Sequence, residues 1–454
     1  MVEREENWVI VGAGFRGLVV AYLLAKNGKK VTIVDSAKEV GGILYAKHWQ
    51  GFDLDIGCHV FDNDTDETTN LTLEILDNEV NPSFIKYASF FNNQKTNGIS
   101  IPDLSSLGQE VSQKILWETL ETATKTEKRS ITLLDKFSTI HGTTAAKIIE
   151  QLMTKTHAIS IKEIDSNALN LTTYKRIKFT SDEMGRFLKK NPILDNKIAV
   201  SSQENPMEFY QEIAQSYARR NFYPNKNGTR LFCEKSKVKL EQLSVNLLLG
   251  KKVEKINVDK NSIEVLISGQ ENPLRADYLL WASSQELIGD LFGIENKLKD
   301  FVYPVPLILY YFTLDEKFVS DYSYIHNFDT NFYTFRASIP TNYGTNNAPK
   351  GKAYVCCEVP CKINSAIWSN PEAYSDTIWE EIKDMGIVSS EAICEGKFLL
   401  KTPVSYKLPK VGYSIELERV LSFIPQERTL GLEDWELTKN SIIKSISKTI
   451  KNNL

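Results

Sequence analysis

Four residues near the start of the chain have types and spacing suited to binding a dinucleotide. Gly12, Gly14 and Gly17 follow the apolar run 8–11, which predicts a buried strand that enters a glycine turn. In such a turn the first glycine makes the tight bend, the second lets the backbone approach a pyrophosphate, and the third lets helix and strand pack closely. Asp35 follows Gly14 by 35 − 14 = 21 residues, where a carboxylate can accept hydrogen bonds from ribose hydroxyls. We therefore predict that these residues bind the adenosine diphosphate part of a cofactor.

The elements that must position these residues are also predicted. Residues 18–26 carry apolar side chains at helical spacing and stop at Asn27-Gly28, a signal for the end of a helix. Residues 31–34 form a second apolar run that ends in Asp35. Strand, turn, helix and strand in this order make a βαβ unit, with the pyrophosphate at the positive helix N-terminus. We expect Phe15, Arg16 and Ser36 to line the same site.

The residues that follow suggest which dinucleotide is bound. The pair Gly41-Gly42 comes next, and residues 51–61 alternate in the manner of a strand. Here the sequence resembles the superfamily of FAD-dependent amine oxidases, protoporphyrinogen oxidases and phytoene desaturases. The resemblance implies that Gly41 and Gly42 let the backbone pass along the cofactor. It also implies that the strand carrying Gly57, Cys58 and His59 runs past the flavin ring.

A second, distant segment extends this resemblance. The turn 222–231, a helix to about Leu243, and strands at 252–258, 262–267 and 276–282 follow the family's order. The resemblance implies that Val253 contacts the adenine through its backbone, and that Ala282 ends a strand at the cofactor. The C-terminal end departs from the family's signature, a Gly-Arg or Gly-Asp pair before a final helix that meets the FAD phosphates. Gly431 is the residue we assign to that position. We expect non-covalent FAD, since no recognisable attachment motif is present.

The predicted fold class is α/β, with a Rossmann-like FAD-binding domain built from discontinuous segments and an α+β substrate domain of mixed sheet and helical insertion. Aromatic strands at 307–312, 322–325, 331–336 and 353–359 are expected to form the substrate-domain sheet. The predicted parts are the first FAD-binding segment, 1–103; a mainly helical insertion, 104–217; the second FAD-binding segment, 218–300; the substrate-domain sheet, 301–425; and a C-terminal return to the FAD domain, 426–454.

Three residues are the candidates for catalysis. His59 is expected beside the flavin, where an imidazole can titrate near physiological pH, or else it is a buried structural residue. Arg336, in a predicted strand over 332–337, could bind a substrate carboxylate or phosphate, or else form a surface salt bridge. Tyr413, like Tyr310 and Tyr333, is a candidate to face the flavin, although aromatic residues in such strands commonly belong to the core.

Composition narrows the remaining choices. Lys and Arg number 54 against 58 Asp and Glu, a net charge of −4, which disfavours a nucleic-acid or anionic-membrane binder. The 6 cysteines are sparse, which suits a reducing compartment, and Cys356, Cys357 and Cys361 lack the spacing of a zinc site. No metal site, signal peptide or membrane span is predicted. We expect a cytoplasmic protein that acts on a small molecule. The sequence leaves its oligomeric state open, with a homodimer among the alternatives.

Three classes of function remain open at this point. The first is an oxidoreductase that takes a hydride from a small polar substrate, such as an amine or sugar nucleotide, or acts on a C–C bond like a desaturase. The second is a non-redox mutase, because Gly57-Cys58-His59-Val60-Phe61 resembles the Gly-x-His-x-Phe motif of UDP-galactopyranose mutase. The third is a flavin-bound protein without catalytic activity. In the oxidoreductase and the mutase, the cofactor supplies the reactive chemistry and the protein supplies orientation and electrostatics.

Overall fold

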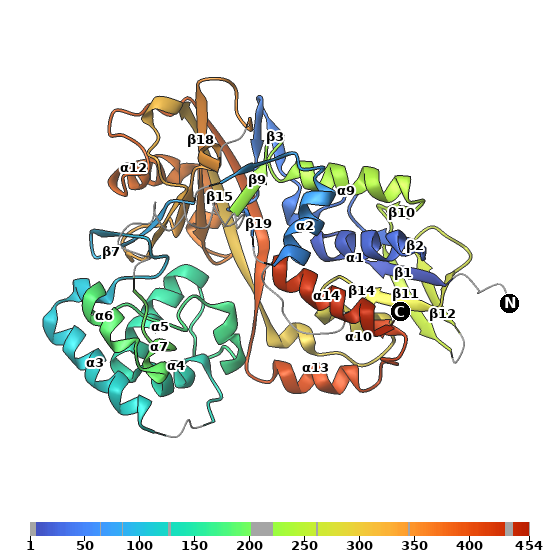
Figure 1. Ribbon diagram of the computed structural model, residues 1–454, viewed down its shortest axis with the longest axis horizontal. Helices are drawn as coiled ribbons and strands as arrows, with labels where there is room; N and C mark the ends of the chain where they lie inside the picture. Colours follow the sequence, from blue (N-terminus) through green and yellow to red (C-terminus); the bar gives the residue numbers. More distant parts are fainter. Residues whose placement is uncertain are drawn as a thin grey trace.

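A parallel sheet with helices packed against it forms the nucleotide-binding part of the computed structural model (Figure 1). The structure describes residues 6–63, 65–83, 85–125, 129–200, 221–259, 262–343, 346–431 and 439–453. All four neighbouring pairs of this sheet are parallel. In spatial order its strands are β10 (Asn246–Leu249), β2 (Lys30–Asp35), β1 (Asn7–Val11), β14 (Tyr278–Trp281) and β20 (Thr429–Leu430).

The strands of this sheet come from three distant stretches of the chain, as the discontinuous Rossmann-like prediction required. Helix α1 (Phe15–Lys26) covers the sheet and buries Leu18, Val19 and Val20 completely. It packs against α9 (Arg230–Gln242) and α14 (Lys439–Asn453), while α2 (Asp66–Ile75) contacts both of these. A smaller antiparallel sheet adjoins it, formed by β11 (Val253–Val258), β12 (Ile263–Ile267) and β13 (Leu274–Ala276).

A seven-stranded mixed sheet forms the second part. Its order is β19 (Gly396–Pro409), β15 (Val302–Asp315), β18 (Lys352–Pro360), β17 (Arg336–Ser338), β16 (Tyr324–Asn327), β7 (Tyr87–Phe91) and β8 (Gln94–Asn97). The long strands β15 and β19 belong to this sheet (Figure 1), and Val302 at the start of β15 is buried in the same apolar cluster as Val9 and Val11 of the nucleotide part. The last two strands fall within the predicted first FAD-binding segment, 1–103, yet they belong to this sheet. Strand β7 pairs with β16, and Ala88 and Phe90 are buried in the core of the sheet.

A helical lobe stands beside the second sheet (Figure 1). It contains α3 (Gln109–Ala123), α4 (Leu133–His141), α5 (Thr143–His157), α6 (Asp182–Leu188) and α7 (Pro192–Asp195). These helices share one apolar core that includes Phe137, Ile149 and Phe179. They fall within the predicted insertion 104–217, of which residues 201–217 lie outside the described part of the chain.

Short elements complete the chain. None of the described helices is long and apolar enough to cross a membrane. The remaining strands are β3 (Lys47–Trp49), β4 (Phe52–Leu54), β5 (Phe61–Asp62), β6 (Val80–Pro82) and β9 (Asn221–Pro224). The remaining α-helices are α10 (Ile288–Leu291), α11 (Ala366–Ser369), α12 (Ser375–Asp384) and α13 (Tyr413–Leu421). The 3-10 helices are η1 (Gly42–Leu44), η2 (Leu104–Leu107), η3 (Ser166–Leu171), η4 (Gln285–Leu287), η5 (Leu298–Phe301), η6 (Glu316–Phe318), η7 (Pro340–Tyr343) and η8 (Pro371–Tyr374).

Two predicted strands differ from the structure. The alternating segment 51–61 is interrupted by a loop over residues 55–60, where Gly57 adopts a φ of +88° that a strand does not allow. The predicted strand over 331–336 is also wrong, since pairing begins only at Arg336. The strand does not start earlier because the carboxylate of Glu381 accepts hydrogen bonds from the backbone N–H groups of Tyr333 and Thr334, at 2.6 and 2.8 Å. These bonds take the place of a strand partner.

Candidate active site

The glycine turn has the geometry that its spacing predicted. Gly12 adopts a φ of +111°, and a β-carbon there would lie 2.7 Å from the carbonyl oxygen of Ala282. A β-carbon on Gly17 would overlap the carbonyl of Gly12, so this glycine permits the close approach of helix and turn. Gly14 differs, because nothing lies within 4 Å of the position its β-carbon would take. The space beside Gly14, at the uncapped N-terminus of α1, therefore suits an anionic group.

Asp35 lies next to this turn and opens onto a pocket. Its carboxylate accepts the backbone N–H of Ala13 at 2.6 Å and that of Ala37 at 2.7 Å. The pocket has a volume of about 480 Å³ and is lined by Gly12, Asp35, Ser36 and Val253, together with residues of β14 and α10. The two predicted nucleotide segments thus meet in one pocket at the carboxyl edge of the sheet, where ligands of open α/β sheets bind.

The other residues assigned to the cofactor surround the turn in different ways. Gly41 has a φ of +106° and donates its N–H to the carbonyl of Ala13 at 2.7 Å, which places the double glycine directly beside Gly14. Phe15 packs against Phe232 with ring centroids 5.2 Å apart. Three more of these residues lie at the ends of elements. Arg16 is in the first turn of α1, and Gly42 begins η1 with a φ of +58°. Gly431 follows β20 with a φ of +77°, and a β-carbon there would lie 2.5 Å from the carbonyl oxygen of Trp281.

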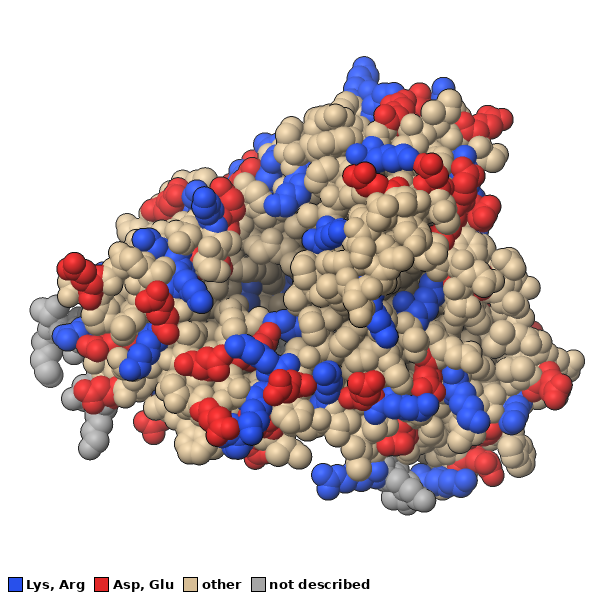
Figure 2. Space-filling model, turned by 180° about the vertical axis from the view of Figure 1, so that it is seen from behind, with Lys and Arg blue, Asp and Glu red and all other residues tan. Residues whose placement is uncertain are grey.

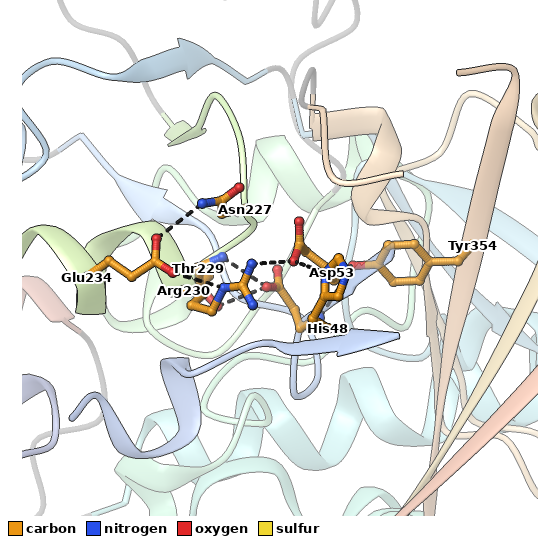
Figure 3. A network of polar contacts seen from close by, with 8 residues as sticks. His48, Asp53, Asn227, Thr229, Arg230, Glu234 and Tyr354 are labelled. Atoms are coloured by element: carbon orange, nitrogen blue, oxygen red, sulfur yellow. Dashed lines mark hydrogen bonds and ion pairs between the residues drawn. The ribbon is translucent and has the colours of Figure 1, made fainter. Parts of the chain in front are cut away.

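A network of polar contacts joins the first nucleotide segment to the second (Figure 3). Asp53, on β4, accepts a hydrogen bond from Arg230 at 2.8 Å, and Arg230 also pairs with Glu234 at 3.2 Å. Asp55 is fully buried and accepts from the backbone and hydroxyl of Thr229 at 3.0 and 2.9 Å, and from the hydroxyl of Tyr223. Burial raises the pKa of Asp55 to about 6 despite these hydrogen bonds. The network holds the loop 55–60 against the second segment.

His59 lies in this loop with one ring nitrogen unused. The ring hydrogen-bonds the backbone of Ile56, while Nε2 is buried with no partner among the described residues. Burial lowers the pKa of His59 to about 3, and the nearby charges of Lys439 and Arg336 lower it further. The expectation that His59 titrates near physiological pH is therefore wrong: the imidazole is neutral there. Because its bond to Ile56 uses Nδ1–H, Nε2 presents a free lone pair.

Arg336 lies close to His59 but is already paired. Its Nε donates to Oε1 of Glu358 at 2.7 Å, and its Nη2 contacts the same oxygen at 2.6 Å. Side-chain exposure is 25% for Arg336 and 7% for Glu358, so the pair is largely sheltered from solvent and is no surface salt bridge. A β-carbon on Gly57 would lie 3.3 Å from the same Glu358 oxygen. The substrate sheet and the loop 55–60 therefore meet at this ion pair.

Tyr343 was not identified from the sequence, yet it contacts the same loop. Its hydroxyl lies 3.1 Å from Sγ of Cys58, and burial raises the pKa of that thiol, which remains protonated. His326, opposite Arg336 in the β16–β17 register, is also buried with Nδ1 unpartnered among the described residues. Neither residue belongs to a sequence motif, so their role could not be anticipated. On the face of the molecule that Figure 2 shows, which is opposite to that of Figure 1, Lys and Arg side chains lie within a hollow near the middle.

The predicted tyrosines do not join this group. Tyr413 is buried in the apolar cluster under the nucleotide sheet, with Val9, Val11 and Trp281. Tyr310 is buried in the core of the second sheet and donates to the carbonyl of Pro371 at 2.9 Å. Tyr333 is 42% exposed and its ring packs against Tyr374. The contacts described for all three are packing contacts, in apolar cores for Tyr413 and Tyr310 and against Tyr374 for Tyr333.

Comparisons with known proteins agree with this architecture. Residues 10–77 match the model of an NAD(P)-binding Rossmann-like domain. A segment of 58 residues is 45% identical to all-trans-retinol 13,14-reductase of Danio rerio, but the match spans 13% of this chain and 10% of the reductase. The fold resembles a crystal structure of reduced UDP-galactopyranose mutase, with a TM-score of 0.74 and 16% identity over 99% of this chain and 94% of that one.

Two further solved structures share the fold over nearly the whole chain. A protein assigned as a protoporphyrinogen oxidase, from Exiguobacterium sp. 255-15, matches with a TM-score of 0.68 and 14% identity over 99% of this chain and 98% of that one. Putrescine oxidase bound to putrescine matches with a TM-score of 0.63 and 14% identity over 99% of both chains. The chain therefore shares the fold of these three structures over nearly its whole length, which agrees with the fold class predicted from the resemblance found in the sequence.

Proposed function

We propose that the chain is an FAD-dependent oxidoreductase that takes a hydride from a small polar substrate held where the loop 55–60 meets the second sheet. The observation that carries the proposal is the convergence of His59 with Arg336, Tyr343 and Glu358, which come from two distant parts of the chain, at the loop 55–60. Buried polar side chains with unused hydrogen-bonding capacity, gathered at one place, are typical of a binding site.

Residues of the nucleotide part fit a non-covalent FAD. The open space at Gly14 and the N-terminus of α1 would accept the diphosphate, and Asp35 would accept hydrogen bonds from the adenosine ribose. The orphaned Nε2 of His59 lies in the loop that the family resemblance places beside the ring. When bound, the flavin supplies the capacity to accept and pass on a hydride. The chain must supply binding, orientation and exclusion of water.

His59 would act as a hydrogen-bond acceptor rather than as a base. A group with a pKa of about 3 takes up protons weakly at neutral pH, so proton abstraction by His59 is disfavoured. Its lone pair at Nε2 can instead accept an N–H or O–H of the substrate and fix the orientation of the reacting carbon. We propose that this orientation is its contribution to the reaction.

The Arg336–Glu358 pair bears on the kind of substrate. Because both Arg336 contacts go to one oxygen of Glu358, the guanidinium keeps unused N–H donors and its charge is compensated. A compensated pair favours a neutral or zwitterionic polar substrate over a strongly anionic one, since no uncompensated positive charge is offered by this pair. We therefore propose a small uncharged or zwitterionic polar molecule, for example an amine bound in its uncharged form, in preference to a nucleotide sugar.

An anaerobic titration separates this proposal from its runner-up. An oxidoreductase loses its visible flavin absorbance when substrate is added without any reductant, and regains it on exposure to an acceptor. The runner-up is a non-redox mutase, favoured by the Gly57-Cys58-His59-Val60-Phe61 pattern. Such an enzyme requires prior reduction by dithionite and turns over its substrate with no net transfer of electrons. Turnover of UDP-galactopyranose by pre-reduced protein only, with no bleaching by a panel of amines, would overturn the oxidoreductase proposal.

A further inference from the structure

A second pocket lies in the helical lobe, apart from the nucleotide site. It has a volume of about 940 Å³ and is formed by the end of α3, the second half of α4, η3 and the segment 192–197 that contains α7. It shares no lining residue with the pocket at Asp35. Concave sites of about 300–1,000 Å³ hold small molecules, so the pocket suits a small ligand better than a macromolecule.

Every charged residue among the described residues that line this pocket is a lysine. The four are Lys125, Lys136, Lys175 and Lys197, and we call the hollow the lysine pocket. The whole chain is by contrast acidic, with a net charge of −4. A hollow lined by charges of one sign focuses the electric field and attracts ligands of the opposite sign. The lysine pocket is therefore suited to an anion.

Lys197 is held at the wall of the pocket by uncharged groups. Its Nζ donates to the carbonyl oxygen of Ile140 at 2.6 Å and to the hydroxyl oxygen of Thr122 at 3.3 Å. These bonds fix the ammonium without cancelling its charge, so little side-chain entropy is lost when an anion binds to it. Lys125 contacts the carboxylate of Glu121 at 3.8 Å, but both side chains are at least half exposed and such a pair is weak.

The lining also indicates how an anion is recognised. The hydroxyls of Ser138 and Thr139 donate to backbone carbonyls one turn earlier in α4, at 3.0 and 2.9 Å, so their O–H groups are already used. Recognition therefore falls to the ammonium groups, which bind negatively charged oxygens as point charges. Several ammonium groups around one hollow favour a ligand that carries more than one negative charge.

We propose that the lysine pocket is a second ligand site, which takes a small molecule with two or more phosphate or carboxylate groups. Both groups offer the same chemistry to an ammonium, a negatively charged oxygen that accepts its N–H groups. The site does not depend on the proposed FAD function, because its lining includes no residue of the nucleotide pocket or of the loop 55–60.

The test is the binding of two probes, inorganic pyrophosphate and citrate, to the full chain by isothermal titration calorimetry. FAD is present in excess, so that the nucleotide site is occupied. We expect at least one probe to bind, and to bind more weakly at high ionic strength, because salt screens exposed charges. Tighter binding of pyrophosphate identifies a phosphate ligand, and tighter binding of citrate identifies a carboxylate ligand.

Variants locate the bound probe. Lys136→Gln/Lys175→Gln removes two charges from exposed or half-buried positions of the lining and should weaken binding by about tenfold or more, which is about 1.4 kcal/mol or more. Asn170→Asp adds a negative charge at an exposed position of the lining and should also weaken binding. Lys114→Gln/Lys147→Gln is the matched control, since it removes two exposed lysines of α3 and α5 that do not line the pocket, and it should bind as the unmodified chain does.

Three results would overturn the inference: neither probe binds, binding is unchanged in both lining variants, or the matched control loses as much affinity as the lining variants. The bound flavin is measured separately, by its visible absorbance. A chain that binds no FAD would overturn the proposed function, and the difference between the lining variants and the control would still decide whether the probe lies in the lysine pocket.

Discussion

Substitution of Gly14 by alanine should remove cofactor binding while leaving the apoprotein folded. The new β-carbon would enter open space, since nothing in the protein lies within 4 Å of it, and the residue has an ordinary φ of −73°. Alanine caps a helix less well than glycine, but it also restricts the unfolded chain; each effect is worth about 0.5–1 kcal/mol and they oppose each other. The free energy of unfolding of the apoprotein should therefore change by less than about 1 kcal/mol.

The effect on FAD should be far larger. The added methyl group would occupy the space proposed for the diphosphate and push it away from the backbone N–H groups of the turn. Two charge-assisted hydrogen bonds lost at about 1.5 kcal/mol each amount to about 3 kcal/mol, which is a loss of at least about a hundredfold in affinity. Urea unfolding of the apoprotein and fluorescence titration with FAD measure the two quantities separately.

Gly17→Ala is the contrasting variant, because its β-carbon would overlap the carbonyl of Gly12. It should destabilise the apoprotein by about 3 kcal/mol or more, as overpacking against rigid backbone does. If Gly14→Ala binds FAD as tightly as the unmodified chain, the diphosphate lies elsewhere and the reasoning from the glycine turn is refuted.

Three further outcomes are expected. Asp35→Ala should weaken FAD binding by about ten- to a hundredfold through loss of the ribose hydrogen bonds, and an unchanged affinity would show that the carboxylate serves only the N–H groups of Ala13 and Ala37. His59→Ala should keep bound flavin but slow its reduction by substrate, and in the unmodified chain that rate should show no titration of His59 between pH 5 and 8, because its pKa is about 3. The folded state should lose stability as pH falls below about 6.5, the ordinary pKa of histidine, since burial lowers the pKa of His141 to about 3 and that of His157 to about 4. At pH 5 each of these histidines should lower the free energy of unfolding by about 2 kcal/mol, and the raised pKa of Asp55 should offset about 1 kcal/mol of that loss. Urea unfolding midpoints that do not fall between pH 7 and pH 5 would contradict this prediction.

The nucleotide half was predictable because its signals are local. Gly12, Gly14, Gly17 and Asp35 lie within one βαβ unit, where each residue type follows from a backbone requirement of the turn. Val253 could be placed only through the family resemblance, yet it lines the same pocket as Asp35. Strand pairing brings the two nucleotide-binding segments together, because β1 pairs with β2 on one side and with the distant β14 on the other.

The substrate side was less predictable because its contacts are not local. Arg336 and Glu358 are 22 positions apart on β17 and β18, and neither residue type nor spacing reveals that they pair. The position of Tyr413 in an apolar core could not be predicted, because an aromatic residue in a core and one at a site look alike in sequence. The protonation state of His59 depends on burial and on the charges of Lys439 and Arg336, which only the folded chain brings near it. The strand predicted at 331–336 failed because the carboxylate of Glu381 captures its backbone.

The identity of the bound cofactor tests the central claim most directly. The protein should be purified, its visible spectrum recorded, and the supernatant analysed after the chain is denatured. We predict a yellow protein that releases FAD into the supernatant, in a ratio approaching one per chain, with no flavin left on the denatured polypeptide. A colourless protein that takes up NADP and no flavin when both are offered would contradict the assignment of the Gly12–Gly17 turn to FAD.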